Sequence, residues 1–504
     1  MHTALLLDMA AEAFPDRTAL GPRDGGIGFG ELAARARGGA AWLAGKGEGT
    51  VVFLGLNGTA LPVAIFASGV LARPFAPLNY RLPDDDLRRL LARTAPSVAI
   101  VDDDMIARVA GTPDVTLVAR SAFEAACLDE GRRAAELELA EPDIAVLLFT
   151  SGTTGEPKAA VLRHRHLASY VISTVEFMGS DEDEAALVSV PPYHIAGVSA
   201  VLTGIYGGRR IVHLPAFTPE TWVEAAVRQE ITHAMLVPTM LGRVLDVLEA
   251  RGEKLPRLRA LSYGGGRMPT AVIERALRLL PHVDFVNAYG LTETSSTIAV
   301  LGPGDHRRAT ASADPNVRRR LGSVGRPLPG LELEIRGSSG EVLPVGATGE
   351  VHVRGEQVAG EYLGRKAIDE DGWFATKDSG WLDADGYLFI EGRLDDVIVR
   401  GGENISPGEI EDVLRNHPQV ADVAVVGVPD DQWGERVAAI VVPRGEAPTP
   451  DELTAWAKAR LRSTKTPEMW EFRAELPYNE TGKLLRRVLK QNLAARASAG
   501  EAAA

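Results

Sequence analysis

The stretch Leu147-Leu-Phe-Thr-Ser-Gly-Thr-Thr-Gly-Glu-Pro-Lys158 closes an apolar run, residues 144–149, that is typical of a short buried strand. Glycines in such a turn let the backbone approach a ligand closely, and successive N–H groups form a concavity that suits an anion. Because hydroxyl groups add donors and a lysine adds positive charge, the stretch predicts a phosphate-binding loop. The residues expected to take part are Thr150, Ser151, Gly152, Thr153, Thr154, Gly155 and Lys158.

An ordinary Gly/Thr turn between two strands explains the same composition, because an apolar run resumes at residues 159–162. The stretch is not a Walker A loop, since no Gly-Lys-Ser/Thr sequence closes it. On these residues alone, the phosphate loop and the plain turn both stay open.

Composition places the chain among ordinary globular proteins: of its 504 residues, 45% are hydrophobic and 24% are charged. The length predicts about three domains or one large multi-lobed protein. A formal net charge of −14 argues against a general nucleic-acid binder, which needs a concentrated basic face. The single cysteine, Cys127, excludes an intrachain disulfide framework and a cysteine-rich metal site, and no motif around it suggests a nucleophile.

The N-terminal sequence does not have the pattern of a targeting signal. Acidic residues follow Met1 closely, and the basic n-region of a signal peptide is missing. No uncharged apolar run approaches the ~20 residues that span a membrane. We therefore expect a cytoplasmic protein without a membrane span.

Helical and strand patterns alternate as far as residue 287, which predicts an α/β fold with a parallel or mixed sheet. The expected helices are residues 3–14, 29–46, 61–71, 84–93, 196–206, 219–229, 240–249 and 271–280. The expected strands are residues 51–56, 98–101, 186–190, 210–214, 235–237, 260–263 and 284–287. Gly264-Gly-Gly-Arg267 and Tyr289-Gly-Leu-Thr-Glu293 follow two of these strands. Since ligands collect outside the carboxyl ends of parallel strands, we expect both clusters to border one crevice with the phosphate loop.

The pattern changes beyond Gly322, where short strands at 331–335, 349–354 and 387–390 alternate with Gly/Pro turns and predict a small β lobe. A compact α+β tail follows. Its expected elements are a helix at 407–416, strands at 420–428 and 437–442, a helix at 449–461 and a last basic helix. We expect an N-terminal domain of residues 1–394 and a C-terminal domain of residues 395–504.

Six motifs, taken together and in this order, resemble those of the AMP-forming adenylating superfamily, which contains acyl-CoA synthetases, adenylation domains of nonribosomal peptide synthesis and luciferase-like enzymes. The resemblance extends from roughly Phe29 to Lys490. The motifs are the opening stretch, Tyr289-Gly-Leu-Thr-Glu293, Gly349-Glu-Val-His-Val-Arg-Gly355, the region of Asp378, Gly392-Arg-Leu-Asp395 and Thr481-Gly-Lys483.

The resemblance implies two half-reactions. A carboxylate attacks the α-phosphate of ATP and gives an acyl-adenylate and pyrophosphate, after which the thiol of coenzyme A displaces AMP. ATP, Mg²⁺, coenzyme A and a small carboxylic acid are therefore the expected partners, with no nucleic acid, and the chain could form a homodimer. The implied architecture is an N-terminal domain of two sheet-and-helix subdomains plus the β lobe, with a smaller mobile C-terminal domain.

The resemblance also assigns nucleotide contacts. It implies that the loop from Thr150 to Lys158 wraps the β- and γ-phosphates, and that Thr292 donates to the α-phosphate while Glu293 holds Mg²⁺. Adenine would lie against a flat glycine wall, the ribose would contact a carboxylate and a guanidinium, and an aromatic ring would stack on the base. The residues implied in these roles are Gly264, Gly265, Gly266, Asn287, Tyr289, Asp378 and Arg393.

Catalysis is implied for Lys483 on the mobile lobe, where its ammonium group would reach the substrate carboxylate and the α-phosphate. Asp395 matches the hinge position about which that lobe rotates. In the rotated pose, Gly401 and Gly402 would border the tunnel for the coenzyme A thiol arm. A solvated helix-start lysine and a tight Gly-Gly turn are the plain alternatives.

Two positions depart from the family pattern. The sequence has Thr376-Lys377-Asp378 where the family commonly has Thr-Gly-Asp, which could alter the loop without removing the carboxylate. Val399 stands where luciferase-like and coumarate-ligase-like members have lysine. This second departure favours the ordinary acyl-CoA synthetase branch.

The residues that line the acyl pocket are the hardest to predict from the sequence. The resemblance implies walls at His194, Val237 and Ala288, with His194 a wall, a gate or a partner for the carboxylate. No aspartate stands where an amino-acid substrate would need a partner for its ammonium group. The sequence does not distinguish medium-chain, branched and aryl acids as substrates. The expected pathway is fatty or aryl acid metabolism, without a closer assignment. The alternatives are another acceptor (a carrier-protein thiol, or amine or N–N bond formation after activation of an unusual oxyanion) and a non-catalytic nucleotide sensor.

Overall fold

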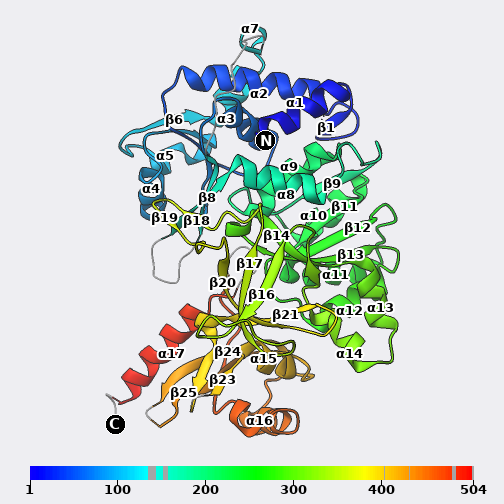
Figure 1. The fold of residues 1–504 in the computed structure, drawn as a ribbon, viewed down its shortest axis with the longest axis vertical. Coiled ribbons are helices and arrows are strands. Elements are labelled where there is room, and N and C mark those ends of the chain that lie inside the picture. The colour runs from blue at the N-terminus through cyan, green and yellow to red at the C-terminus, as the bar shows by residue number, and fades with distance from the viewer. Residues whose placement is uncertain (134–143, 151–156, 402, 431, 479–483, 502–504) are drawn as a thin grey trace.

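A computed structural model describes residues 1–133, 144–150, 157–401, 403–430, 432–478 and 484–501 of the chain. Figure 1 shows the first helices at the top, a large green sheet in the middle and the C-terminal domain, orange to red, at the bottom. No helix among the described residues is both long and apolar enough to cross a membrane.

Two large sheets form the N-terminal part of the molecule. One has the order β19-β18-β8-β7-β4-β3-β5-β6 and the other the order β15-β14-β13-β12-β11-β9-β10-β1-β2. The strands of the first are β3 (Thr50–Leu54), β4 (Phe75–Pro77), β5 (Ser97–Val101), β6 (Val115–Ala119), β7 (Ile144–Thr150), β8 (Lys158–Arg163), β18 (Glu361–Tyr362) and β19 (Arg365–Lys366). Those of the second are β1 (Thr18–Leu20), β2 (Ile27–Gly28), β9 (Ala185–Val188), β10 (Arg210–His213), β11 (His233–Leu236), β12 (Ala260–Gly264), β13 (Asp284–Leu291), β14 (Ser296–Leu301) and β15 (Arg326–Pro327).

Helices cover both faces of each sheet, because alternate residues of a buried strand face opposite cores. In β3, Val51 and Phe53 pack into the core between the two sheets, while Val52 and Leu54 pack into a core on the outer face. The layer between the sheets contains α1 (Ala4–Ala13), α2 (Phe29–Ala44), α3 (Ala60–Val70), α8 (His164–Thr174) and α9 (Ile195–Tyr206). The outer faces are covered by α4 (Asp84–Ala92) on one side and by α10 (Pro219–Arg228), α11 (Pro238–Arg251), α12 (Thr270–Leu279) and α13 (Pro303–Ala311) on the other.

The β lobe and the C-terminal domain each have a sheet of their own. The lobe is an antiparallel sheet of β16 (Glu332–Arg336), β17 (Gly349–Arg354), β20 (Phe374–Leu382) and β21 (Leu388–Arg393). The C-terminal sheet contains β22 (Ile398–Arg400), β23 (Glu403–Ile405), β24 (Val420–Asp430), β25 (Gly434–Pro443) and β26 (Met469–Phe472), with α15 (Pro407–Arg415), α16 (Pro450–Lys458) and α17 (Arg486–Glu501). The predicted α/β class and the smaller α+β tail are confirmed.

The sequence predictions omitted the strands β6, β14 and β20, and three further local details differ. Strand β13 was expected to end at residue 287 but continues to Leu291, so Tyr289 lies within the strand, at a bulge against β14. Residues around Gly401 form a hairpin between β22 and β23 that periodicity did not reveal. Strands as short as β18 and β19 contain too few residues to show an alternation, which is why they were missed.

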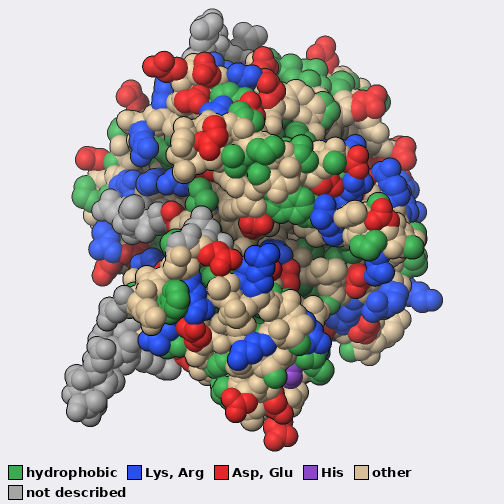
Figure 2. Space-filling model, turned by 60° about the horizontal axis from the view of Figure 1, so that its bottom comes forward, with side chains coloured by type: hydrophobic (Ala, Val, Ile, Leu, Met, Phe, Trp, Pro, Cys, Tyr) green, Lys and Arg blue, Asp and Glu red, His purple; other side chains and the backbone are tan. Residues whose placement is uncertain are grey.

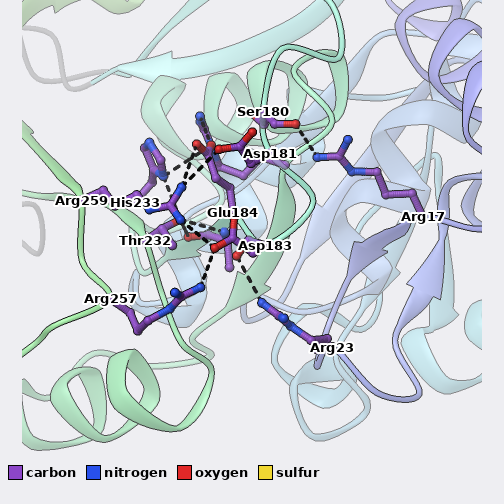
Figure 3. Close-up of polar contacts among 12 residues, drawn as sticks. Arg17, Arg23, Ser180, Asp181, Asp183, Glu184, Thr232, His233, Arg257 and Arg259 are labelled. Atoms are coloured by element: carbon purple, nitrogen blue, oxygen red, sulfur yellow. Dashed lines mark hydrogen bonds and ion pairs between the residues drawn. The ribbon is translucent and has the colours of Figure 1, made fainter.

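A network of charged side chains ties the amino ends of the central strands together (Figure 3). Asp183, just before β9, accepts from Arg257 and Arg259 at 2.6 Å each, and Glu184 accepts from Arg209 at 2.7 Å. Arg17, beside β1, donates to the carbonyl of Ser180 at 2.6 Å. These charges lie at the edge of the sheet opposite the carboxyl ends of the strands, where ligands bind. We therefore assign them a structural role in holding the strands together.

Acidic and basic side chains intermingle over the face shown in Figure 2. Cys127 is buried, and burial raises the pKa of its thiol to about 12. A thiol that stays protonated at neutral pH is a poor nucleophile, in agreement with the reading of the sequence.

The N-terminal segment is held by two buried, stacked histidines. The rings of His2 and His164 lie 4.0 Å apart, and Nδ1 of His164 accepts from the backbone N–H of Thr3. Burial, together with His2 and the N-terminal amine, lowers the pKa of His164 to about 3. The folded protein therefore keeps this ring neutral at pH values where an unfolded chain would protonate it.

We predict that this histidine makes the protein less stable in mild acid. Between the unfolded value of 6.5 and the folded value of about 3, only the unfolded chain binds the proton, so stability falls as the pH falls through this window. From pH 7.5 to pH 5 the loss is about 2 kcal/mol for this group. Urea unfolding of the protein and of His164→Gln at both pH values measures it. An equal pH dependence in the two proteins contradicts the prediction.

Candidate active site

The carboxyl ends of β11, β12 and β13 bring the predicted glycine wall together with two acyl-pocket residues. A Cβ atom added to Gly264 would lie 2.2 Å from the carbonyl oxygen of Ala288, so this position tolerates only glycine. Gly265 has φ +75°, and a Cβ there would lie 3.5 Å from Val237. Gly265 and Gly266 are exposed at the end of β12. A flat, side-chain-free surface therefore lies beside Val237 and Ala288.

A bulge in β20 presents Asp378 to Tyr289 of β13. Strand β17 pairs with β20 at Glu350↔Ser379 and again at His352↔Ala375, so residues 376–378 of β20 stand opposite a single residue. The extra backbone is pinned by Thr376, whose hydroxyl donates to Val351 at 2.8 Å and accepts from the N–H of Asp378 at 3.1 Å. The carboxylate of Asp378 is thereby held in a fixed position while remaining buried.

Two predicted residues donate to that carboxylate. The hydroxyl of Tyr289 donates to Oδ2 of Asp378 at 2.6 Å, and Nη1 of Arg393 donates to Oδ1 at 3.1 Å. Burial and the charge of Asp378 raise the pKa of Tyr289 well above its usual value. Burial, the largest single influence, opposes the charge of Arg393, but the attractions of Asp378, Tyr289 and Glu293 together outweigh it and raise the pKa of the guanidinium. Tyr289 is therefore a neutral donor and Arg393 a permanent cation.

Lys377, the residue that replaces the family's glycine, has φ +62°. This left-handed region costs a residue with a Cβ atom roughly 1–2 kcal/mol. The backbone N–H of Lys377 donates to Glu350 at 3.1 Å, while its side chain is exposed. The bulge thus demands a conformation that glycine would adopt freely.

Glu293 lies in a short 3₁₀ turn, Thr292–Thr294, that follows β13. Its side chain is buried, and Oε1 accepts from the hydroxyl of Tyr362 at 2.6 Å. Its carbonyl accepts from the N–H groups of Ala359 and Gly360, each at 2.9 Å. Thr292, half-buried, begins the same turn.

The backbone just after Glu293 is strained. Ser295 and Ser296 have φ +58° and +118°, conformations that residues with a Cβ atom rarely adopt. Such strain persists where the surroundings over-determine it, and it clusters at functional sites.

The two ends of the predicted phosphate loop lie close to Glu293. Thr150 ends β7 and Lys158 begins β8, and the hydroxyl of Thr150 donates to the carbonyl of Lys158 at 3.4 Å. The ammonium of Lys158 lies 5.9 Å from the ring centre of Tyr362. Ser151, Gly152, Thr153, Thr154 and Gly155 lie outside the described residues.

Tyr362 is the site residue that sequence reasoning missed. It pairs with Ala160 of β8 and contacts both Lys158 and Glu293. A two-residue strand carries no periodicity, and only the pairing of β18 with β8 brings this tyrosine to the site. No signal in the sequence could have identified it.

The other predicted residues fall nearby or in the C-terminal domain. Asn287 is buried, and its Nδ2 donates to the carbonyl of Ser323 at 3.0 Å. His194 immediately precedes α9, with its ring 5.8 Å from that of Tyr193. Asp395 lies in a 3₁₀ turn between β21 and β22, and Gly401 in the β22–β23 turn with φ +57°. Lys483 and Gly402 lie outside the described residues.

A cavity of about 380 Å³ continues along the carboxyl edge of the same sheet. Its walls come from the segments after β9, β10 and β11, from the segments after β3 and β4 of the other large sheet, and from Tyr478 of the C-terminal domain. They include Tyr80, Arg81, Phe217, Thr239 and Arg243. Asn57 and Ser189 also line it, and both are buried. Oδ1 of Asn57 and Oγ of Ser189 find no hydrogen-bond partner among the described residues.

The donor set suits magnesium bound together with a phosphate ligand. No group of three or more His, Cys, Asp or Glu side chains that could hold a metal occurs in the described part of the chain. Mg²⁺ is commonly held by one or two carboxylates plus substrate phosphates, and Glu293 supplies such a carboxylate.

Comparison with known proteins identifies the family. The model of the AMP-binding enzyme matches residues 7–363, and that of the AMP-binding enzyme C-terminal domain matches residues 409–483. The chain belongs to the AMP-binding enzyme family.

Individual relatives align over nearly the whole chain. A feruloyl-CoA synthase from an Amycolatopsis species is 35% identical over 443 residues, 86% of this chain and 87% of that one. An indoleacetate–CoA ligase from Aromatoleum aromaticum is 32% identical and covers 98% of each chain. The structure of O-succinylbenzoate coenzyme A synthetase from Bacillus subtilis with ATP and magnesium superposes with a TM-score of 0.81, at 28% identity, over 96% of this chain and 99% of that one.

These findings confirm the predicted superfamily and the predicted reaction, ATP-dependent adenylation followed by thioester formation. The predicted use of ATP, Mg²⁺ and coenzyme A is confirmed together with the reaction. The protein is therefore an enzyme of the AMP-forming ligase family. The expectations of a homodimer and of a cytoplasmic location stay predictions.

We predict that Lys377→Gly stabilises the protein, because glycine removes the cost of the left-handed backbone. The gain is limited to about 1 kcal/mol, since glycine also raises the entropy of the unfolded chain. Lys377→Ala is the matched control: it deletes the same ammonium group but keeps the strained backbone. Urea unfolding of the three proteins measures the difference. Equal stability of the glycine and alanine variants would show that the bulge is not strained.

Proposed function

We propose that the protein activates an aryl carboxylic acid as its adenylate and transfers the acyl group to coenzyme A. The single observation that carries the assignment of roles is the pair of buried carboxylates, Asp378 and Glu293, each held by a tyrosine hydroxyl. Asp378, polarised by Arg393, is proposed to accept from the ribose hydroxyls. Glu293 is proposed to hold Mg²⁺, and the metal when bound neutralises phosphate charge as pyrophosphate leaves.

The remaining nucleotide contacts follow the geometry around these carboxylates. We propose that the adenine lies on the Gly264–Gly266 surface, beside Tyr289 and Asn287. Thr292, next to Glu293, would donate to the α-phosphate, and the Thr150–Lys158 loop would hold the β- and γ-phosphates. Lys158 supports this role because its ammonium lies beside Tyr362, the partner of Glu293.

The C-terminal domain is proposed to supply Lys483 for adenylation and to rotate about Asp395 for thioester formation. Tyr478, which precedes Lys483 by only a few residues, lines the cavity of the N-terminal domain, which supports a lysine that can reach the site. The contacts that join the domains are polar. Arg267 pairs with Asp412, and the hydroxyl of Ser406 donates to the carbonyl of Glu391 at 2.8 Å. Polar interfaces of this kind permit domain motion.

The cavity of about 380 Å³ is proposed as the path of the coenzyme A arm. It lies at the junction of the two domains, with Arg81 and Arg243 on its walls to attract phosphate groups. Asn57 Oδ1 and Ser189 Oγ, which find no partner among the described residues, can pair with the amide groups of the arm. Gly401 and Gly402 would border the same path in the rotated pose.

An aryl acid is proposed for two reasons. The relatives named above act on feruloyl and indoleacetyl groups, both aromatic. The predicted pocket wall at His194 continues into aromatic neighbours, since Tyr193 contacts His194 at 5.8 Å and Tyr80 at 5.7 Å between ring centres. The Tyr193–Tyr80 contact is edge-to-face, and aromatic walls of this kind favour aromatic guests.

ATP–pyrophosphate exchange over a panel of carboxylic acids tests this function. We expect exchange with hydroxylated cinnamic or arylacetic acids in the absence of coenzyme A, and AMP release that requires it. Preference for aliphatic acids would contradict the aryl assignment. AMP release that requires a carrier protein or an amine would contradict the acceptor.

Lys483→Ala is the matched variant for that experiment. It should abolish pyrophosphate exchange but leave thioester formation from a supplied acyl-adenylate largely intact, because the ammonium stabilises only the first transition state. Equal loss of both half-reactions would remove Lys483 from this role.

Ser189→Ala tests the path of coenzyme A. The hydroxyl has no partner among the described residues, so its loss should not unfold the protein. Losing a hydrogen bond of about 1 kcal/mol should raise KM for coenzyme A roughly five-fold, with pyrophosphate exchange unchanged. Ser68→Ala is the control, because that buried hydroxyl lies in α3 and donates to the carbonyl of Ile65 at 2.8 Å. A raised KM for the acid instead would assign the cavity to the acid.

A further inference from the structure

Arg267 lies where the two domains meet and directly follows the surface proposed for adenine, Gly264–Gly266. Its guanidinium reaches α15 of the C-terminal domain, where it forms an ion pair with the carboxylate of Asp412. The segment that ends the adenine surface is therefore bonded directly to the domain that carries Lys483.

The start of α15 approaches Arg267 closely because Gly408 has no side chain. A Cβ atom added to Gly408 would lie 2.2 Å from Nη1 of Arg267 and 3.1 Å from the carbonyl oxygen of Glu391. The hydroxyl of Ser406, just before α15, donates to that same carbonyl at 2.8 Å. Burial raises the pKa of Glu391, and Arg267 is one of the neighbours that oppose this shift. Arg267 thus lies between β21 of the N-terminal domain and α15 of the C-terminal domain.

Asp412 is also the outer member of a charge network inside the C-terminal domain. Nη1 of Arg415, one turn further along α15, lies 3.7 Å from the carboxylate of Asp412. Nε of Arg415 donates to Asp422 at 3.3 Å, and the hydroxyl of Tyr478 donates to Asp422 at 2.6 Å. The network therefore runs from Arg267 to Tyr478, which lines the cavity of the N-terminal domain.

A second branch of this network reaches α17, which begins shortly after Lys483 in the sequence. Arg415 lies 3.7 Å from the carboxylate of Glu411. Glu411 is buried, and it accepts a hydrogen bond from Nη2 of Arg486, the first residue of α17. Helix α15 is therefore bonded to the N-terminal domain through one side chain and to residues on both sides of Lys483 through others.

The pose of the C-terminal domain brings Tyr478, rather than the hairpin between β22 and β23, to the N-terminal domain. Tyr478 lines the cavity, whereas Gly401 in the hairpin is exposed. Adenylation by Lys483 requires this arrangement under the proposed function. A rotation that brought Gly401 to the site instead would carry α15 away and break the ion pair between Arg267 and Asp412.

We propose that Arg267 is a positioning residue: its ion pair with Asp412 holds the C-terminal domain in the adenylating pose and so positions Lys483. This role rests on the proposed function, in which that domain rotates about Asp395. The side chains of the pair are 42% and 37% exposed, and ion pairs of such exposure shift an equilibrium by about five-fold at most. A weak polar contact suits a domain that must leave the pose in every turnover.

The pose is measured first, without turnover, by single-molecule energy transfer between dyes on Lys254→Cys and Lys458→Cys. Both lysines are exposed, one on each domain, and the natural Cys127 is buried and takes no label. Asp412→Asn should lower the ratio of the pose described here to all other poses about two- to five-fold. A pose ratio that Asp412→Asn leaves unchanged overturns the proposal.

Asp284→Asn is the matched control for this measurement. It neutralises a half-exposed carboxylate whose partner, Arg307, belongs to the same N-terminal domain, so the pose ratio should stay as in the wild type. An equal shift in the control and in Asp412→Asn would trace the effect to net charge and overturn the role of the interdomain pair.

The two half-reactions then test the link to Lys483. Asp412→Asn should slow pyrophosphate exchange about two- to five-fold and leave thioester formation from a supplied acyl-adenylate undiminished, because the rotated pose lacks the ion pair. Arg267→Gln should act in the same way, and the double variant should be no slower than the slower single variant. Equal loss of both half-reactions, which a merely structural role predicts, overturns the proposal, as do additive losses in the double variant. Absence of exchange with every acid would contradict the proposed function, while the pose ratio, which needs no substrate, would still decide what the ion pair does.

Discussion

The N-terminal part of the molecule depends on the hydrogen bonds that converge on Glu293. The segment from Gln357 to Tyr362 leaves the sheet of the β lobe and becomes a strand of the eight-stranded sheet. On its way it donates to the turn after β13, through Gln357 to the carbonyl of Thr294 at 3.1 Å and through Ala359 and Gly360 to Glu293. Three sheets therefore meet at one residue. Burying a carboxylate is costly unless it is hydrogen-bonded, and the hydroxyl of Tyr362 supplies that bond.

Three of the seven described non-glycine residues with positive φ lie beside the two buried carboxylates. Ser295, Ser296 and Lys377 all have positive φ values, and all lie within three residues of Glu293 or Asp378. Strain of this kind is stable only where neighbouring contacts fix the backbone, as the hydroxyl of Thr376 does for the bulge in β20. Rigid carboxylates lower the cost of organising a polyanion and a metal at the moment of reaction. The strained backbone lowers the stability of the fold but fixes the positions of the two carboxylates.

Most of the fold was predictable because buried strands and amphipathic helices leave a periodic signal over five or more residues. The helices at 29–46 and 196–206 were expected within two residues of α2 and α9. The residues predicted to bind the nucleotide were chosen through motifs, which fix residue types but not their partners. The bonds from Tyr289 and Arg393 to Asp378 join three segments far apart in the chain, and no local pattern encodes them. Tyr362 and the conformation of Lys377 were inaccessible for the same reason, since each depends on a short strand pairing or a bulge.

The position of Tyr362 shows how one short strand links the active site to a separate ion pair. Its hydroxyl fixes Glu293, while the adjacent Glu361 is bound by Arg163 on the opposite side of the strand. Backbone hydrogen bonds hold the segment as well: the N–H of Leu363 donates to the carbonyl of Ala159 at 2.9 Å, and that of Ala367 to the carbonyl of Gly360 at 2.7 Å. Two neighbouring side chains of β18 therefore join an ion pair on one face of the strand to the hydrogen bond that positions Glu293 on the other.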